Sequence, residues 1–167
     1  TPSLKASFTY NTDFAQTEVD DRQINLTRFP LRFPEKRDFF LEGSSILQFA
    51  PQSNVNAYFS RRIGLVGGVP IPIEYGGRLL GNVGKSNIAL IHVRTGEEGE
   101  LNPENFTVAR IRRDFWKESS IGVLYTMRST DEDQLFDEPV QDRHTLGADL
   151  TLATSEFLGD KVLQFSS

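Results

Sequence analysis

Two-residue alternation in the second half of the chain is the feature that most constrains its fold. The stretch 145–154 carries one apolar series at every second position, Leu146, Ala148, Leu150 and Leu152. The stretch 120–128 does the same with Ile121, Val123, Tyr125 and Met127. A period of two places successive side chains on opposite faces of a strand and does not fit the 3.6-residue period of a helix. The pattern therefore predicts β-strands with one apolar and one more polar face. It also places Asp149 opposite the apolar side, where it would meet solvent or a polar barrel lumen.

Candidate strands succeed one another from residue 78 and are separated by residues that favour turns. They span Arg78–Gly84, Asn87–Thr95, Phe106–Arg113, Ser120–Arg128, Thr145–Thr154 and Lys161–Ser166. Earlier in the chain, Leu4–Asn11 alternates with one wet and one dry face, and Gln23–Arg28 is a further short candidate. About eight strands suffice to close a small barrel. We therefore expect an all-β antiparallel meander that forms a β-barrel, with a β-sandwich as the alternative.

Proline sets the first half of the chain apart. In Phe29–Gly43, Pro30 and Pro34 lack a backbone donor and push the preceding residue towards extended geometry. This segment is predicted to form a turn or corner, neither a helix nor a central strand. The glycine- and proline-rich stretch Leu65–Gly77 is predicted to be a loop, because its prolines are unsuited to a central strand.

The domain organisation follows from this contrast. We expect a single β domain over residues 1–167, with a proline- and charge-rich first half (1–75) and a regular strand meander (76–167). The first half is predicted to pack as a corner or plug against the lumen of the barrel.

Charged residues are concentrated in the corner. We interpret five of them as a structural ion-pair motif, since an unpaired buried charge is too costly: Glu35, Lys36, Arg37, Asp38 and Glu42. Further along, Arg61 and Arg62 are adjacent, and paired arginines can bind a carboxylate or phosphate in a fork geometry. The alternative is that these two arginines pair with acidic residues of the corner.

Composition excludes several classes of function. The net charge of -5 argues against nucleic-acid binding, which needs a basic face. The chain has no cysteine, and its two histidines, His92 and His144, lie far apart in sequence, so we expect no metal site and no cofactor. The acidic stretch 12–22 is predicted to be an exposed connection, with a divalent-cation site as the alternative. No catalytic motif is recognisable, and catalytic residues stay unassigned.

Several motifs resemble those of a known protein family. They are Asp13–Gln16, Val19–Pro30, Phe33–Gly43, Phe59–Gly64 and Asn105–Asp114. Together they make residues 12–124 similar to a bacterial family of uncharacterised proteins. Members of that family carry an N-terminal family-9-like carbohydrate-binding module and a long C-terminal region thought to form an outer-membrane-type β-barrel. The resemblance implies that this chain, which lacks the module and is shorter than that region, is part of the barrel.

Three functions are compatible with these patterns. The first is a non-catalytic outer-membrane-type β-barrel or a segment of one, in contact with membrane lipid and serving carbohydrate handling or transport, at the bacterial outer membrane or cell surface. The second is a soluble, secreted or periplasmic carbohydrate-binding β domain, with Tyr58, Phe59, Tyr75 and Trp116 as stacking platforms. The third is a glycosidase-like hydrolase with carboxylates at a barrel mouth. The ligand-binding candidates are Arg61, Arg62, Tyr58 and Trp116.

Overall fold

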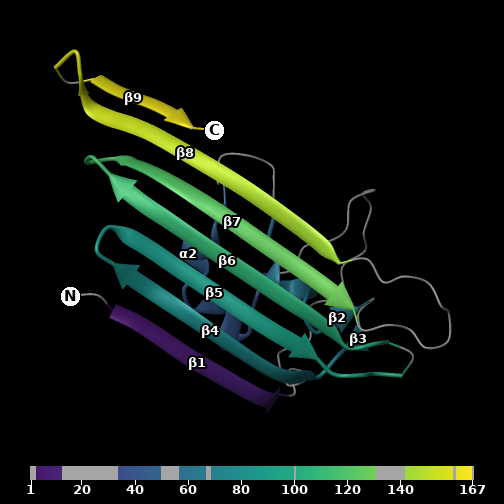
Figure 1. Ribbon diagram of the computed structural model, residues 1–167. Helices are drawn as coiled ribbons and strands as arrows, with labels where there is room; N and C mark the ends of the chain where they lie inside the picture. Colours follow the sequence, from purple (N-terminus) through teal and green to yellow (C-terminus); the bar gives the residue numbers. More distant parts are fainter. Residues whose placement is uncertain are drawn as a thin grey trace.

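The alternating stretches build one antiparallel sheet. The computed structural model describes residues 3–12, 34–49, 57–66, 69–99, 101–130, 142–159 and 161–166. Its sheet has seven strands in the order β1-β4-β5-β6-β7-β8-β9 (Figure 1). Their bounds are β1 Ser3–Thr12, β4 Ile73–Val83, β5 Ser86–Thr95, β6 Glu104–Phe115, β7 Ser119–Thr130, β8 Arg143–Phe157 and β9 Lys161–Ser166. From β4 onward every strand pairs with the next one in sequence, which confirms the predicted antiparallel meander.

The sheet differs from the expectation in its extent and in its closure. β1 pairs with β4, so the two halves of the chain share one sheet. β4 begins at Ile73 instead of Arg78, directly after Pro72, which is the last proline of the stretch Leu65–Gly77 and lacks a backbone donor. Within the described residues the sheet is open, with β1 and β9 at its edges. The candidate strand Gln23–Arg28 and most of the acidic stretch 12–22 lie outside the described residues.

The described residues between β1 and β4, which we call the corner from here on, include residues 34–43 of the predicted turn segment and contain short helices. These are α1 (Asp38–Leu41), α2 (Ser44–Leu47) and the 3-10 turn η2 (Ser60–Arg62), followed by the small ladder of β2 (Leu65–Val66) and β3 (Val69–Pro70). The expectation that Phe29–Gly43 contains no helix is wrong for α1. No proline follows Pro34 in this segment, so one helical turn can form after the extended residue Arg37. Gly43, at φ 73°, then links α1 to α2.

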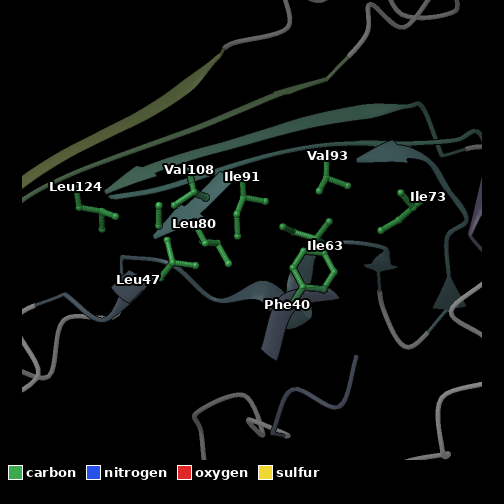
Figure 2. Packing of buried hydrophobic residues seen from close by; sticks show 10 residues of the cluster. Phe40, Leu47, Ile63, Ile73, Leu80, Ile91, Val93, Val108 and Leu124 are labelled. Carbon is green, nitrogen blue, oxygen red and sulfur yellow. The ribbon is translucent and has the colours of Figure 1, made fainter. Parts of the chain in front are cut away.

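The core lies between the corner and one face of the sheet. Phe40, Leu47 and Ile63 come from the corner and point towards the strands (Figure 2). On the sheet side they meet Ile73, Leu80, Ala89, Ile91, Val93, Val108 and Leu124. We call this side of the sheet the covered face. It also carries buried polar residues, among them Arg78 and Arg110.

The opposite side of the sheet is apolar and exposed. Residues opposite one another in the antiparallel register share a face, which puts the apolar series of each strand on this side. Its members include Leu4, Phe8, Tyr10, Leu90, Ile111, Ile121, Val123, Leu146, Leu152 and Phe165, all exposed. The predicted division of each strand into two faces is confirmed. However, the side expected to be dry in residues 4–11 is the exposed one, with Phe8 85% accessible.

Candidate functional site

Three arginines on or near the covered face organise its polar contacts. The first, Arg37, is buried and forms a two-pronged pair with Glu35, in which its Nε and Nη2 each donate to a carboxylate oxygen at 2.7 Å. Its Nη1 and Nη2 also donate to the carbonyl oxygens of Ile63 and Ser60, at 2.5 and 2.8 Å. The guanidinium lies 4.3 Å from the centre of the Phe40 ring. Arg37 therefore ties α1 to η2.

The Glu35–Arg37 pair affects the pKa of the Glu35 carboxyl and of the nearby Tyr58 hydroxyl. Burial alone would raise the pKa of the Glu35 carboxyl. Hydrogen bonds from Arg37 and Ser60, together with the Arg37 charge, instead lower that pKa below its ordinary value of 4.5. Burial, reinforced by the Glu35 charge, raises the pKa of the Tyr58 hydroxyl. Glu35 is thus held as a carboxylate and Tyr58 as a neutral phenol, which suits a structural cluster better than a proton-transfer site.

The second arginine, Arg78 on β4, joins the sheet to α1. It donates to the carbonyl oxygens of Phe39 and Asp38 and to the carboxylate of Glu42. Glu42 also accepts a hydrogen bond from Lys5 on β1, at 2.5 Å. One carboxylate therefore links β1, β4 and the corner. The interactions with Lys5 and Arg78 lower the pKa of the Glu42 carboxyl.

The third arginine, Arg110 on β6, is the most deeply buried, with 1% of its surface accessible. It forms a two-pronged ion pair with Asp149 on β8, in which Nη2 lies 2.9 Å from Oδ2. The pair passes over β7 at Gly122, where an added Cβ would lie 2.7 Å from the guanidinium nitrogens. Only glycine leaves room for this contact.

The end of the corner packs against the Arg110–Asp149 pair. The Phe49 ring, just after α2, lies 5.5 Å from the guanidinium carbon. Beneath that ring is Gly147 on β8, where an added Cβ would lie 2.5 Å from a ring carbon. The two glycines, Gly122 and Gly147, form a notch in the covered face that holds the guanidinium and the aromatic ring.

The contacts of Arg78 and Lys5 with α1 and Glu42, and the packing of Phe49 on Arg110, hold the corner on the sheet. Glu35, Glu42 and Asp149 each accept from arginine, and charged pairs of this geometry are the strong hydrogen bonds of proteins. No group of three or more potential metal ligands occurs in the part of the chain that the structure describes. The geometry therefore supports an anchoring role better than a catalytic one. Among those same residues, no helix has the length and apolar character needed to cross a membrane.

The predicted site residues do not form one site. Arg61, buried, and Arg62, exposed, lie on η2, and half-buried Tyr58 precedes them. Trp116 is 79% accessible in the turn between β6 and β7, at the far end of the sheet from β2 and β3 (Figure 1). Of the predicted ion-pair motif, Glu35, Arg37 and Glu42 form side-chain pairs, while Asp38 contributes its carbonyl oxygen.

Sequence reasoning missed the roles of Arg78 and Arg110. Each is a single charge within an alternating strand, and the sequence does not indicate which face will be covered. The mid-strand charge of Asp149 did signal a polar environment, and the structure supplies its partner.

Comparison with known proteins gives one match. Residues 5–72 match a family described as a domain of unknown function (DUF5916). The matched stretch contains most of β1 and the corner with its short helices, and it ends just before β4. It is consistent with the resemblance to an uncharacterised family and does not address a carbohydrate-binding module or a barrel. No curated protein and no solved structure matches the chain.

Proposed function

We propose that the chain is part of the wall of an outer-membrane-type β-barrel, with its corner as an inner plug and its exposed apolar face against lipid. The observation that carries this proposal is the distribution of polarity over the sheet. The covered face holds buried arginines and carboxylates, and the exposed face holds large apolar side chains. Transmembrane barrels have this arrangement, with polar residues inside and an apolar band outside.

The free energy of apolar burial favours contact of the exposed face with lipid instead of water. A large apolar side chain gains about 1.5–3 kcal/mol when it leaves water. Phe8, Ile111, Val123 and Leu146 forgo most of this gain in the isolated sheet. Contiguous apolar patches of this kind mark an interaction surface. Contact with hydrocarbon would remove the whole face from water at once.

Strand length and joint length agree with the proposal. A transmembrane strand needs about 9–11 residues at a tilt of about 45°. β4 to β8 have 11, 10, 12, 12 and 15 residues. The turns after β4, β6 and β8 are short, whereas the joints after β5 and β7, residues 96–103 and 131–142, are longer. Outer-membrane barrels have short turns at one end and longer loops at the other.

Closure of such a barrel requires further strands. The smallest transmembrane barrels have eight strands, and the sheet formed by the described residues has seven. The edges β1 and β9 are the places where additional strands would pair, contributed by further chain or by another copy. Pairing there would also protect the unpaired edges from non-specific association.

A soluble carbohydrate-binding domain is the second candidate. Trp116 borders a cleft of about 210 Å³, together with residues 117–118 and 153–156. An exposed tryptophan beside polar side chains is a plausible stacking platform for a sugar ring. Among the described residues, Glu35, Glu42 and Asp149 are each engaged by an arginine, which does not favour a hydrolase.

Two single-cysteine variants would test the lipid contact. The chain has no native cysteine, so Ile111→Cys and Arg112→Cys can each carry an environment-sensitive fluorophore in the full chain refolded into lipid vesicles. Both positions are exposed, and they lie on opposite faces of β6. We expect the label at 111 to emit at shorter wavelength and to be quenched by lipid-borne nitroxide, and the label at 112 to be quenched by aqueous iodide. Iodide quenching of both labels would overturn the proposal.

A further inference from the structure

We infer that the short turns at one end of the sheet insert into a phospholipid headgroup layer, with Trp116 as the principal anchor. This inference rests on the proposed membrane contact and adds the position of the bilayer along the strands. The turns after β4, β6 and β8 lie at the same end of the sheet (Figure 1). The partner is a bilayer surface that offers phosphate groups above hydrocarbon.

Each of these three turns combines an exposed apolar residue with a lysine. The pairs are Val83 with Lys85, Trp116 with Lys117, and Leu158 with Lys161. Two of the turns also contain the residues that turns in water favour, Gly84 with Ser86 and Gly159, whereas the turn 116–118 contains Trp116, Lys117 and Glu118. An apolar side chain beside a lysine suits an interface, where the apolar group enters the acyl boundary and a lysine such as Lys85 reaches a phosphate. Lys117 is instead paired with Glu156.

Two of the apolar residues occupy an unfavourable backbone conformation. Trp116 has φ 52° and Leu158 has φ 51°, in the left-handed region that glycine and asparagine adopt more easily. Both side chains are largely exposed, at 79% and 75%. In water, a bulky apolar residue in this conformation has two unfavourable free-energy terms. One is backbone strain, and the other is exposed apolar surface. Insertion into an interface would offset both, and strain of this kind often accompanies function.

The polar groups around Trp116 already have partners within the protein. Lys117 Nζ lies 2.6 Å from a Glu156 carboxylate oxygen, and Ser155 Oγ donates to Glu118 at 2.6 Å. The indole itself packs edge-on against Phe115, with ring centres 5.2 Å apart. A sugar site would need polar groups directed at the ligand, so this surrounding favours a lipid interface over a saccharide.

Amphipathic rings also border the apolar face at its other end. Tyr75 lies beside His92, with ring centres 6.1 Å apart, and Tyr125 shares a hydrogen bond of 2.9 Å with His144 Nδ1. Aromatic girdles flank the apolar band of outer-membrane barrels at both interfaces. On β8, Phe157 lies thirteen positions after His144, at the end of the strand near the Trp116 turn. At about 3.3 Å per residue and a tilt of about 45°, that span covers roughly 30 Å of membrane thickness.

The orientation follows from the turns. Short turns of outer-membrane barrels face the periplasm. Trp116, Leu158 and Val83 would therefore enter the inner, phospholipid leaflet, and the opposite end of the sheet would face outward.

The fluorescence of Trp116 tests this directly, because it is the only tryptophan in the chain. The full chain is refolded into vesicles of phosphatidylcholine and phosphatidylglycerol. We expect emission at short wavelength, weak quenching by iodide, and stronger quenching by a nitroxide near the headgroup than by one at the end of the acyl chain. A matched control, Trp116→Phe with Glu98→Trp, moves the fluorophore to the opposite end of the sheet and should be open to iodide.

A second variant separates anchoring from folding. Trp116→Asn relieves the left-handed strain, so the folded protein in detergent should unfold at the same or a higher urea concentration than the parent chain. Its partition into vesicles should fall about tenfold, since a large aromatic ring is lost from the interface. Unchanged partition would overturn the inference.

The failures can be told apart. If the label at position 111 lies in lipid while Trp116 stays open to iodide, the headgroup anchor is wrong and the membrane contact stands. If iodide quenches both the label at position 111 and Trp116, the membrane contact and the headgroup anchor are both wrong. Quenching of Trp116 by an oligosaccharide, with no effect of nitroxide lipid, would replace the anchor with a sugar site.

Discussion

The two faces of the same sheet differ in their side chains and in what covers them. The covered face mixes aliphatic residues with arginine–carboxylate pairs and is packed by the corner. The exposed face is almost uniformly apolar between its two ends and has no cover among the described residues. In a sheet that faces water on one side, the apolar series normally lies inside. Burial of apolar surface by the corner is therefore only part of what decides which face of the sheet is covered. Specific charge pairing on the covered face must supply the remaining preference.

Removal of one member of the buried pair should have the largest effect. Asp149→Leu leaves the Arg110 guanidinium without its carboxylate in a site where only 1% of the arginine is accessible. We expect the free energy of unfolding to fall by about 3–5 kcal/mol. A urea titration, under conditions where the protein is monodisperse, measures this loss.

The double variant Arg110→Met with Asp149→Leu sharpens the test. A buried ion pair replaced by apolar residues of similar size is often tolerated, so most of the stability should return. A control is Glu74→Gln, which breaks the more exposed Arg94–Glu74 pair and should change stability by less than about 1 kcal/mol. Equal losses at positions 149 and 74 would contradict the distinction between the buried pair and the more exposed one.

The next effect comes from the glycine notch. An alanine Cβ at position 122 would lie 2.7 Å from the Arg110 guanidinium, so Gly122→Ala should cost about 1–3 kcal/mol through overpacking. Gly77 lies on the exposed face, where the same Cβ would meet the Phe8 ring at an ordinary 3.4 Å. Gly77→Ala should therefore be close to neutral. The two variants are compared by urea midpoint, and a reversed order would show that the covered face is the looser one.

The smallest expected effect depends on pH. Because the pKa of Glu35 is lowered in the folded protein, its contribution to stability is present above the ordinary value of 4.5 and is lost as the pH falls through the folded value. Glu35→Gln should thus destabilise the protein at neutral pH, and the gap to the parent chain should narrow in acid. Urea midpoints of both proteins at neutral pH and well below pH 4.5 measure that gap. A gap that is constant with pH would mean that the Glu35–Arg37 pair does not hold the corner.

Much of the fold could be predicted from local patterns. The period of two identified the strands of the meander, and the strand Lys161–Ser166 matches its predicted bounds. Turn residues located the joints. Local patterns did not predict α1, because a single helical turn of four residues has too little periodicity to recognise.

The candidate site was harder to predict because its contacts are distant in sequence. Arg110 and Asp149 are 39 residues apart, and their pairing needs a glycine on the strand between them. No local sequence pattern indicates that Arg110 pairs with Asp149 across β7. None indicates that Phe49 packs in the notch. Trp116 was selected as an exposed aromatic residue, but its left-handed backbone became apparent only in three dimensions.

The sequence by itself determined how each strand divides into two faces, because alternation is a property of neighbouring residues and survives any packing. Only the tertiary structure decided which of the two faces is covered. That choice depends on where the corner docks, and the corner docks where the sheet residues Arg78 and Arg110 meet its carbonyl, carboxylate and aromatic groups. Since an unpaired buried charge costs more than an exposed apolar side chain, the charges selected the inner face and left the apolar face outside.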